Sequence, residues 1–130
     1  MGLIAKMICV DDDIFIQEVF KSIMEEHFHV ALASSAERAL DLMESRGPFD
    51  IVISGYDMPG MNGLEFLSLV AARWPESIRI LMSGGGADMA EVKRAISAGH
   101  ISRFLVQPFC LITLRDQLRE ACNGRAAPVA

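Results

Sequence analysis

Short apolar runs alternate along this chain with segments in which apolar residues recur every three or four positions. The runs are almost wholly apolar, which is typical of strands buried on both faces of a sheet. The segments between them have the period of amphipathic helices. Five strands that alternate with five helices predict an α/β fold, a doubly wound parallel sheet with helices on both faces. We expect the strands at residues 6–10, 29–33, 50–54, 78–82 and 101–106.

Polar residues and helix breakers mark the expected helix ends. Ser34 and Glu37 have the S-x-x-E spacing of a capping box, and Gly47-Pro48 is expected to end the helix that follows. Asp88 is expected to cap a helix whose apolar face carries Val92, Ala95 and Ile96. Pro108, whose peptide bond has the setting for a cis form, precedes the last helix. The apolar face of that helix is expected to hold Leu111, Leu114, Leu118 and Ala121.

A chain of 130 residues with 52% apolar residues is long enough for one domain with its own core. We expect this domain at residues 4–124, followed by a flexible tail at 125–130. The net charge of −5 argues against broad nucleic-acid binding, which draws on basic patches. No apolar run approaches the roughly 20 residues that cross a bilayer. A cytoplasmic location is therefore expected, with reduced thiols at Cys9, Cys110 and Cys122.

Three consecutive aspartates, Asp11, Asp12 and Asp13, follow the first expected strand. Chemistry in such sheets gathers at the carboxyl ends of the strands. Adjacent carboxylates repel one another unless a cation or hydrogen bonds compensate, and their oxygens suit Mg²⁺. Helix capping explains one or two of the three, so the triplet indicates a functional site.

The strand ends as a set resemble the receiver domain of bacterial response regulators, the CheY-like superfamily. The resemblance covers residues 4–123 and rests on four motifs in order: V-D-D-D at 10–13, D-M-P-G-M-N-G at 57–63, I-L-M-S at 80–83 and F-L-V-Q-P-F at 104–109. It implies the flavodoxin-like strand order 2-1-3-4-5 in a three-layer α/β/α sandwich. It also implies a role in two-component (phosphorelay) signal transduction.

In that family a histidine kinase gives a phosphoryl group to an aspartate at the end of the third strand, beside a bound Mg²⁺. Carried over by position, the metal ligands are Asp11, Asp12 and the backbone carbonyl of Asp57. Ser83 takes the place of the hydroxyl that binds the phosphoryl group and acts as a switch. Phe104 takes the place of the switch aromatic residue.

Two positions depart from the family pattern, because Gly55 stands at the acceptor and Gln107 at the phosphate-binding lysine. Glycine offers no nucleophile, and glutamine keeps a donor but loses the positive charge. Asp57 lies two positions along the loop, and Ser54 should point to the other side of the sheet, so neither is expected to replace the acceptor. We therefore expect a phosphorylation-independent signalling or docking module that is not an enzyme, with weak or absent Mg²⁺ binding.

The resemblance also implies the partners, a sensor histidine kinase or an output domain or protein. Contact is expected on the face built by the fourth helix, fifth strand and fifth helix, around Arg94, Arg103 and Phe104. A homodimer through the same face stays open. Neither direct nucleic-acid contact nor membrane contact is expected.

Two other classes share parts of this pattern. A haloacid-dehalogenase-like phosphatase also has a D-x-D strand end, as at Asp11 and Asp13, and a later hydroxyl, as at Ser83. That class needs a second acidic motif downstream, which this chain lacks. A flavodoxin-like FMN-binding protein shares the architecture, but three aspartates would repel the FMN phosphate.

Overall fold

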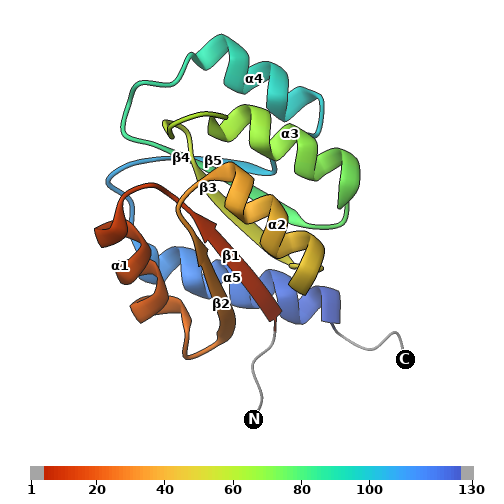
Figure 1. Cartoon of the computed structure of the whole chain (residues 1–130). Coiled ribbons are helices and arrows are strands. Elements are labelled where there is room, and N and C mark those ends of the chain that lie inside the picture. Colours follow the sequence, from red (N-terminus) through yellow and green to blue (C-terminus); the bar gives the residue numbers. More distant parts are fainter. Residues whose placement is uncertain (1–4, 127–130) are drawn as a thin grey trace.

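The computed structural model describes residues 5–126, with side chains to residue 122, and this part of the chain forms one five-stranded parallel sheet (Figure 1). The strand order is β2-β1-β3-β4-β5, which confirms the predicted topology. Strands and helices alternate along the described chain: β1 (Ala5–Val10), α1 (Ile14–Met24), β2 (Phe28–Ala33), α2 (Ala36–Arg46), β3 (Ile51–Gly55), α3 (Gly63–Arg73), β4 (Ile78–Ser83), α4 (Met89–Ser97), β5 (Arg103–Val106) and α5 (Leu111–Ala126).

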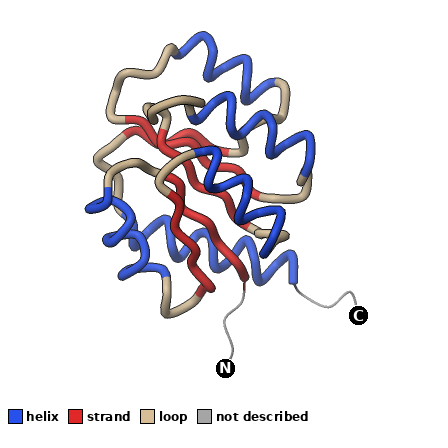
Figure 2. The backbone as a smooth tube through the Cα atoms, in the orientation of Figure 1, coloured by secondary structure: helices blue, strands red, loops and turns tan. Residues whose placement is uncertain are grey.

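Two apolar cores lie on opposite faces of the sheet. Helices cover both faces of the sheet (Figure 2). Alternate side chains of β1 face alternate cores, so Ile8 and Val10 pack towards α2, α3 and α4, while Met7 and Cys9 pack towards α1 and α5. This arrangement is the predicted three-layer α/β/α sandwich. It leaves the carboxyl ends of β1, β3, β4 and β5 side by side at one edge.

The start of α2 differs from its prediction. Ser35, rather than Ser34, caps the helix and accepts the backbone N–H of Arg38 at 3.1 Å, so the predicted capping box of Ser34 and Glu37 is wrong. Both serines carry the same hydroxyl, and only the packed position of the helix selects between them. The predicted cap at Asp88 and the helix end at Gly47 are confirmed. So is the cis peptide bond at Gln107-Pro108.

Two expected core positions lie on the surface instead. Ile96 is 47% exposed, because α4 buries only a narrow strip that includes Val92 and Ala95. On α5 the buried face continues from Leu118 to Cys122, which is four residues on, and Ala121 is exposed. Helix α5 continues to Ala126, which includes the start of the predicted tail, and residues 127–130 lie outside the described residues.

A buried arginine, Arg79, lies near the start of β4, at the end of the sheet opposite the carboxyl ends of the strands. Arg79 is 8% exposed, and its guanidinium donates to oxygens of uncharged groups, including the carbonyls of Ser77, Gly99 and His100 at 2.8–2.9 Å. Burial lowers the pKa of Arg79. These bonds tie the loop before β4 to the loop before β5. No helix in the described part of the chain is long and apolar enough to cross a membrane.

Candidate functional site

A cavity of about 230 Å³ lies at the carboxyl ends of the strands. Its lining brings together residues that follow β1, β3, β4 and β5, as expected for the open edge of a doubly wound sheet. The sequence-predicted residues that line it are Asp11, Asp12, Gly55, Asp57, Ser83 and Gln107. Phe104, the predicted switch aromatic residue, lies outside this cavity, since it is half-buried and packs against the core beneath α2, α3 and α4.

Local hydrogen bonds fix two of the three consecutive aspartates. The carboxylate of Asp13 caps α1 by accepting the backbone N–H of Phe15 at 2.9 Å. Asp11 accepts the N–H of Asp13 through Oδ1, also at 2.9 Å. Asp12 is exposed beside them. One aspartate therefore serves the helix, and the others remain at the cavity.

Gln17, which was not among the predicted site residues, supports the loop that carries the three aspartates. Its side-chain amide is buried and donates to the carbonyl of Asp11 at 2.6 Å and to that of Ala33 at 3.2 Å. These bonds hold the aspartate loop against the end of β2. The sequence does carry a signal for this role, namely an amide side chain on the otherwise apolar face of a helix. A buried polar group needs a hydrogen-bond partner, so such an amide is expected to bind neighbouring backbone.

Asp11 lies over Gly55. A Cβ atom built on Gly55 would be 2.7 Å from Asp11 Oδ2, which is closer than real Cβ contacts. The Asp11 carboxylate thus occupies the space that a side chain at position 55 would enter. Partial burial raises the pKa of Asp11, and the neighbouring charges of Asp12 and Asp13 raise it further, while the bond from the Asp13 backbone opposes them.

The loop after β3 turns back tightly because of Gly63. A Cβ atom there would lie 2.1 Å from the carbonyl oxygen of Gly55, so only glycine fits this close approach. The N–H of Gly63 donates to the carbonyl of Tyr56 at 2.9 Å. This fold of the loop brings Asp57 to the cavity, with its carboxylate directed towards Gly86 of the next loop.

Ser83 and Gln107 complete the cavity wall. Ser83 is buried, and its hydroxyl oxygen accepts the N–H of Gly85 at 3.1 Å. The backbone N–H of Gln107 donates to the carbonyl of Ser83 at 2.8 Å, which aligns the ends of β4 and β5. No lysine or arginine lines this cavity within the described part of the chain, so its carboxylates have no cationic partner.

The fit of these residues to Mg²⁺ is poor. Among the described side chains, no three of the types His, Cys, Asp and Glu lie close enough together to hold a metal ion. Asp13 is used as a helix cap, and Gly55 supplies no ligand where a central carboxylate would be needed. Magnesium therefore has no part in the function proposed below.

The fold and the strand-end cavity define a doubly wound α/β domain with a candidate site at the carboxyl ends of its strands, and comparison with known proteins identifies its family. The family model of the response regulator receiver domain matches residues 7–119, so the chain belongs to this family. It is a receiver domain of two-component signal transduction, a class of generally non-enzymatic modules that interact with histidine kinases and output domains. The phosphatase alternative is not favoured.

Similar proteins carry the same domain. The hydrogenase transcriptional regulatory protein HoxA of Cupriavidus necator is 32% identical over 93% of this chain, and the response regulator protein FleR of Pseudomonas aeruginosa is 36% identical over 93%. The chain spans 25% of the length of each. The signal receiver domain of an HD domain-containing protein from Pseudomonas fluorescens Pf-5 superposes with a TM-score of 0.83 at 28% identity, over 95% of this chain and 98% of that one.

Proposed function

We propose that this receiver domain signals or docks without phosphorylation at the usual acceptor position. The observation that carries the proposal is Gly55, where no side chain can attack phosphorus and where the Asp11 carboxylate fills the space instead. An aspartyl phosphate requires a carboxylate that approaches the phosphoryl group in line. Asp11 lies in the loop after β1, and one of its oxygens accepts the Asp13 N–H.

The cavity also lacks the positive charge that phosphoryl transfer needs. Gln107 occupies the place of the family lysine, and glutamine cannot offset the charge of a phosphoryl group. Such transfer depends on placed positive charge more than on covalent chemistry. A phosphoryl donor approaching this cavity meets several carboxylates and no basic side chain from the described residues that line it.

Neither neighbouring nucleophile is well placed to substitute. The Ser54 hydroxyl is buried and donates to the carbonyl of Gly55 at 2.9 Å, so it is directed away from an incoming donor. Asp57 lies on the loop beyond β3 with its carboxylate towards Gly86. In our proposal the domain is therefore not an enzyme and carries no covalent intermediate.

The proposed partner surface is the face of α4, β5 and α5, around Arg94, Arg103 and Phe104. Three apolar side chains in α4 and β5 are exposed by about half: Met89, Ile96 and Val106. A group of exposed apolar side chains is typical of a protein interface. We place a kinase, an output domain or a second copy of this chain on this face, in the cytoplasm.

Intact mass spectrometry after incubation with Mg²⁺ and acetyl phosphate tests the proposal. The native protein is expected to gain no phosphoryl group, and the Gly55→Asp, Gln107→Lys variant is expected to gain one. A stable phosphoryl adduct on the native protein would refute the proposal, and peptide mapping would then begin at Asp57. The double variant is the control that shows the assay and the fold are competent.

A further inference from the structure

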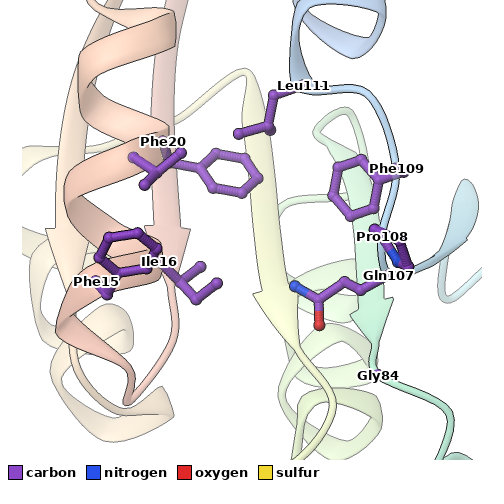
Figure 3. A pocket seen from close by; sticks show the side chains of 9 residues that line it. Phe15, Ile16, Phe20, Gly84, Gln107, Pro108, Phe109 and Leu111 are labelled. Carbon is purple, nitrogen blue, oxygen red and sulfur yellow. The ribbon is translucent and has the colours of Figure 1, made fainter.

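A second, apolar cavity of about 480 Å³ lies between α1 and the chain that follows β5 (Figure 3). Phe15 and Phe20 form its wall on the side of α1, and Phe109 and Leu111 form the wall opposite. Its volume falls within the range of about 300–1,000 Å³ that is typical of small-molecule sites. Phe15 is 72% exposed, so a ligand here would remove apolar surface from water.

The apolar cavity adjoins the acidic cavity at the strand ends. Both are lined by Ile16, Gly84 and Gln107, so these residues form the junction between the two spaces. Figure 3 shows the Gln107 amide projecting into the gap between α1 and the loop. No lysine or arginine of the described chain lines either cavity. One end of the joined space is therefore apolar, and the other is anionic.

We propose that the joined cavities bind a small amphipathic amine. The apolar body of this ligand, aromatic or branched, lies between Phe15 and Phe109. Its single ammonium group lies beyond Gln107 among the carboxylates of Asp11, Asp12 and Asp57. The charges favour this class of ligand, because an anion would be repelled and a neutral apolar molecule would gain nothing from the carboxylates.

The residue at position 107 determines whether the acidic cavity is open to the ammonium group of a ligand. A lysine at this position would carry its own ammonium group into the junction and compete with an external one. The glutamine amide is neutral, so the position that a lysine ammonium group would take remains available to the ammonium group of a ligand. This inference goes beyond the proposed function and holds whether or not the domain accepts a phosphoryl group.

Titration of the ¹⁵N-labelled protein, followed by amide chemical shifts in the presence of EDTA, tests the inference. The probes are 2-phenylethylamine and tryptamine, each compared with its neutral counterpart, 2-phenylethanol or tryptophol. We expect shifts at residues 15–20, 107 and 109–111, which line the apolar cavity and the junction, and for the amines also at residues 11–13 and 57 of the acidic cavity. The amines should bind with a Kd of about 1 mM, as fragments of this size do, and the alcohols about tenfold more weakly.

Variants of Gln107 and Phe15 separate the two ends of the site. Gln107→Lys is expected to weaken amine binding by about tenfold and to leave alcohol binding within about twofold. Gln107→Met, which adds no charge, is the matched control and should retain the preference for amines. Phe15→Ala, at an exposed position that the fold does not need, should weaken both members of each pair.

Three results would each overturn the inference. In the first, amines and alcohols bind equally, so the carboxylates play no part. In the second, the shifted amides lie outside the residues that line the two cavities. In the third, no amine shifts these amides at concentrations up to about 10 mM, well above the Kd expected for such fragments.

Discussion

Gly55→Asp restores a carboxylate at the centre of the strand-end cavity, and we expect it to destabilise the protein when no metal is present. The Cβ atom of residue 55 would lie 2.7 Å from Asp11 Oδ2. Asp11 must therefore rotate away, and its rotation is inexpensive because the contact is with the end of a flexible side chain. The new carboxylate nevertheless stays near that of Asp11.

Coulomb's law sets the size of the effect. Two unit charges about 4 Å apart repel by about 1 kcal/mol in water and about 4 kcal/mol at an effective dielectric constant of 20. The cavity is open to solvent and the Asp11 side chain is half-buried, so the repulsion should lie between these two values. We therefore expect Gly55→Asp to lower the free energy of unfolding by about 1–3 kcal/mol relative to Gly55→Asn. The asparagine variant has the same shape without the charge.

Urea unfolding of both variants, with and without Mg²⁺, measures the difference. Repulsion raises the pKa of the carboxyl pair in the folded state, so the deficit of the aspartate variant is present at pH 7 and fades as the pH falls through that raised pKa. The new carboxylate also supplies the missing central ligand, so Mg²⁺ should restore stability. Saturation at about 100 times the Kd corresponds to about 2.7 kcal/mol.

Equal stability of the two variants at pH 7 in EDTA would refute the placement of Asp11 over Gly55. The same conclusion would follow if Mg²⁺ stabilised Gly55→Asn as much as Gly55→Asp. The native protein should gain little from Mg²⁺, and calorimetry that shows tight, stoichiometric binding would contradict this expectation.

Three further changes test other parts of the structure. Asp11→Asn should raise stability by about 0.5–1 kcal/mol at pH 7, because the raised pKa of Asp11 means that its ionised form is disfavoured in the folded state. Urea midpoints should show this gain shrinking as the pH falls through that raised pKa and disappearing below the pKa of the unfolded chain, and a constant gain would contradict it. Arg79→Met should cost about 2–4 kcal/mol in urea unfolding, since it leaves buried carbonyls without donors, and a loss below about 0.5 kcal/mol would contradict this role. Cys110 is exposed, and hydrogen bonds from Thr113 lower its pKa, whereas burial raises the pKa of Cys9. Iodoacetamide should modify Cys110 first, at a rate whose pH midpoint rises in Thr113→Val, and an unchanged midpoint would contradict the assignment.

Much of the site could be located from the sequence. Each residue predicted for the phosphoryl or metal site lines the strand-end cavity, because the carboxyl ends of adjacent parallel strands meet at one edge. Gly55 and Gln107 were recognisable as departures because the surrounding motifs keep their spacing. The position of Asp11 over Gly55 could not be predicted, since it depends on a side-chain orientation across two strands.

The alternation of strands and helices and the cap at Asp88 were determined by the sequence itself, because periodicity and capping act between residues close in the chain. The strand order was predicted only through the resemblance to receiver domains. Tertiary structure decided between Ser34 and Ser35, and between Ala121 and Cys122. An α-helix has a non-integer number of residues per turn, so two adjacent residues can fit the same apolar pattern almost equally well. Only packing against the rest of the protein selects between them. The carbonyl contacts of Arg79 and the junction of the two cavities at Gln107 likewise join segments distant in the chain, and only the folded protein brings those segments together.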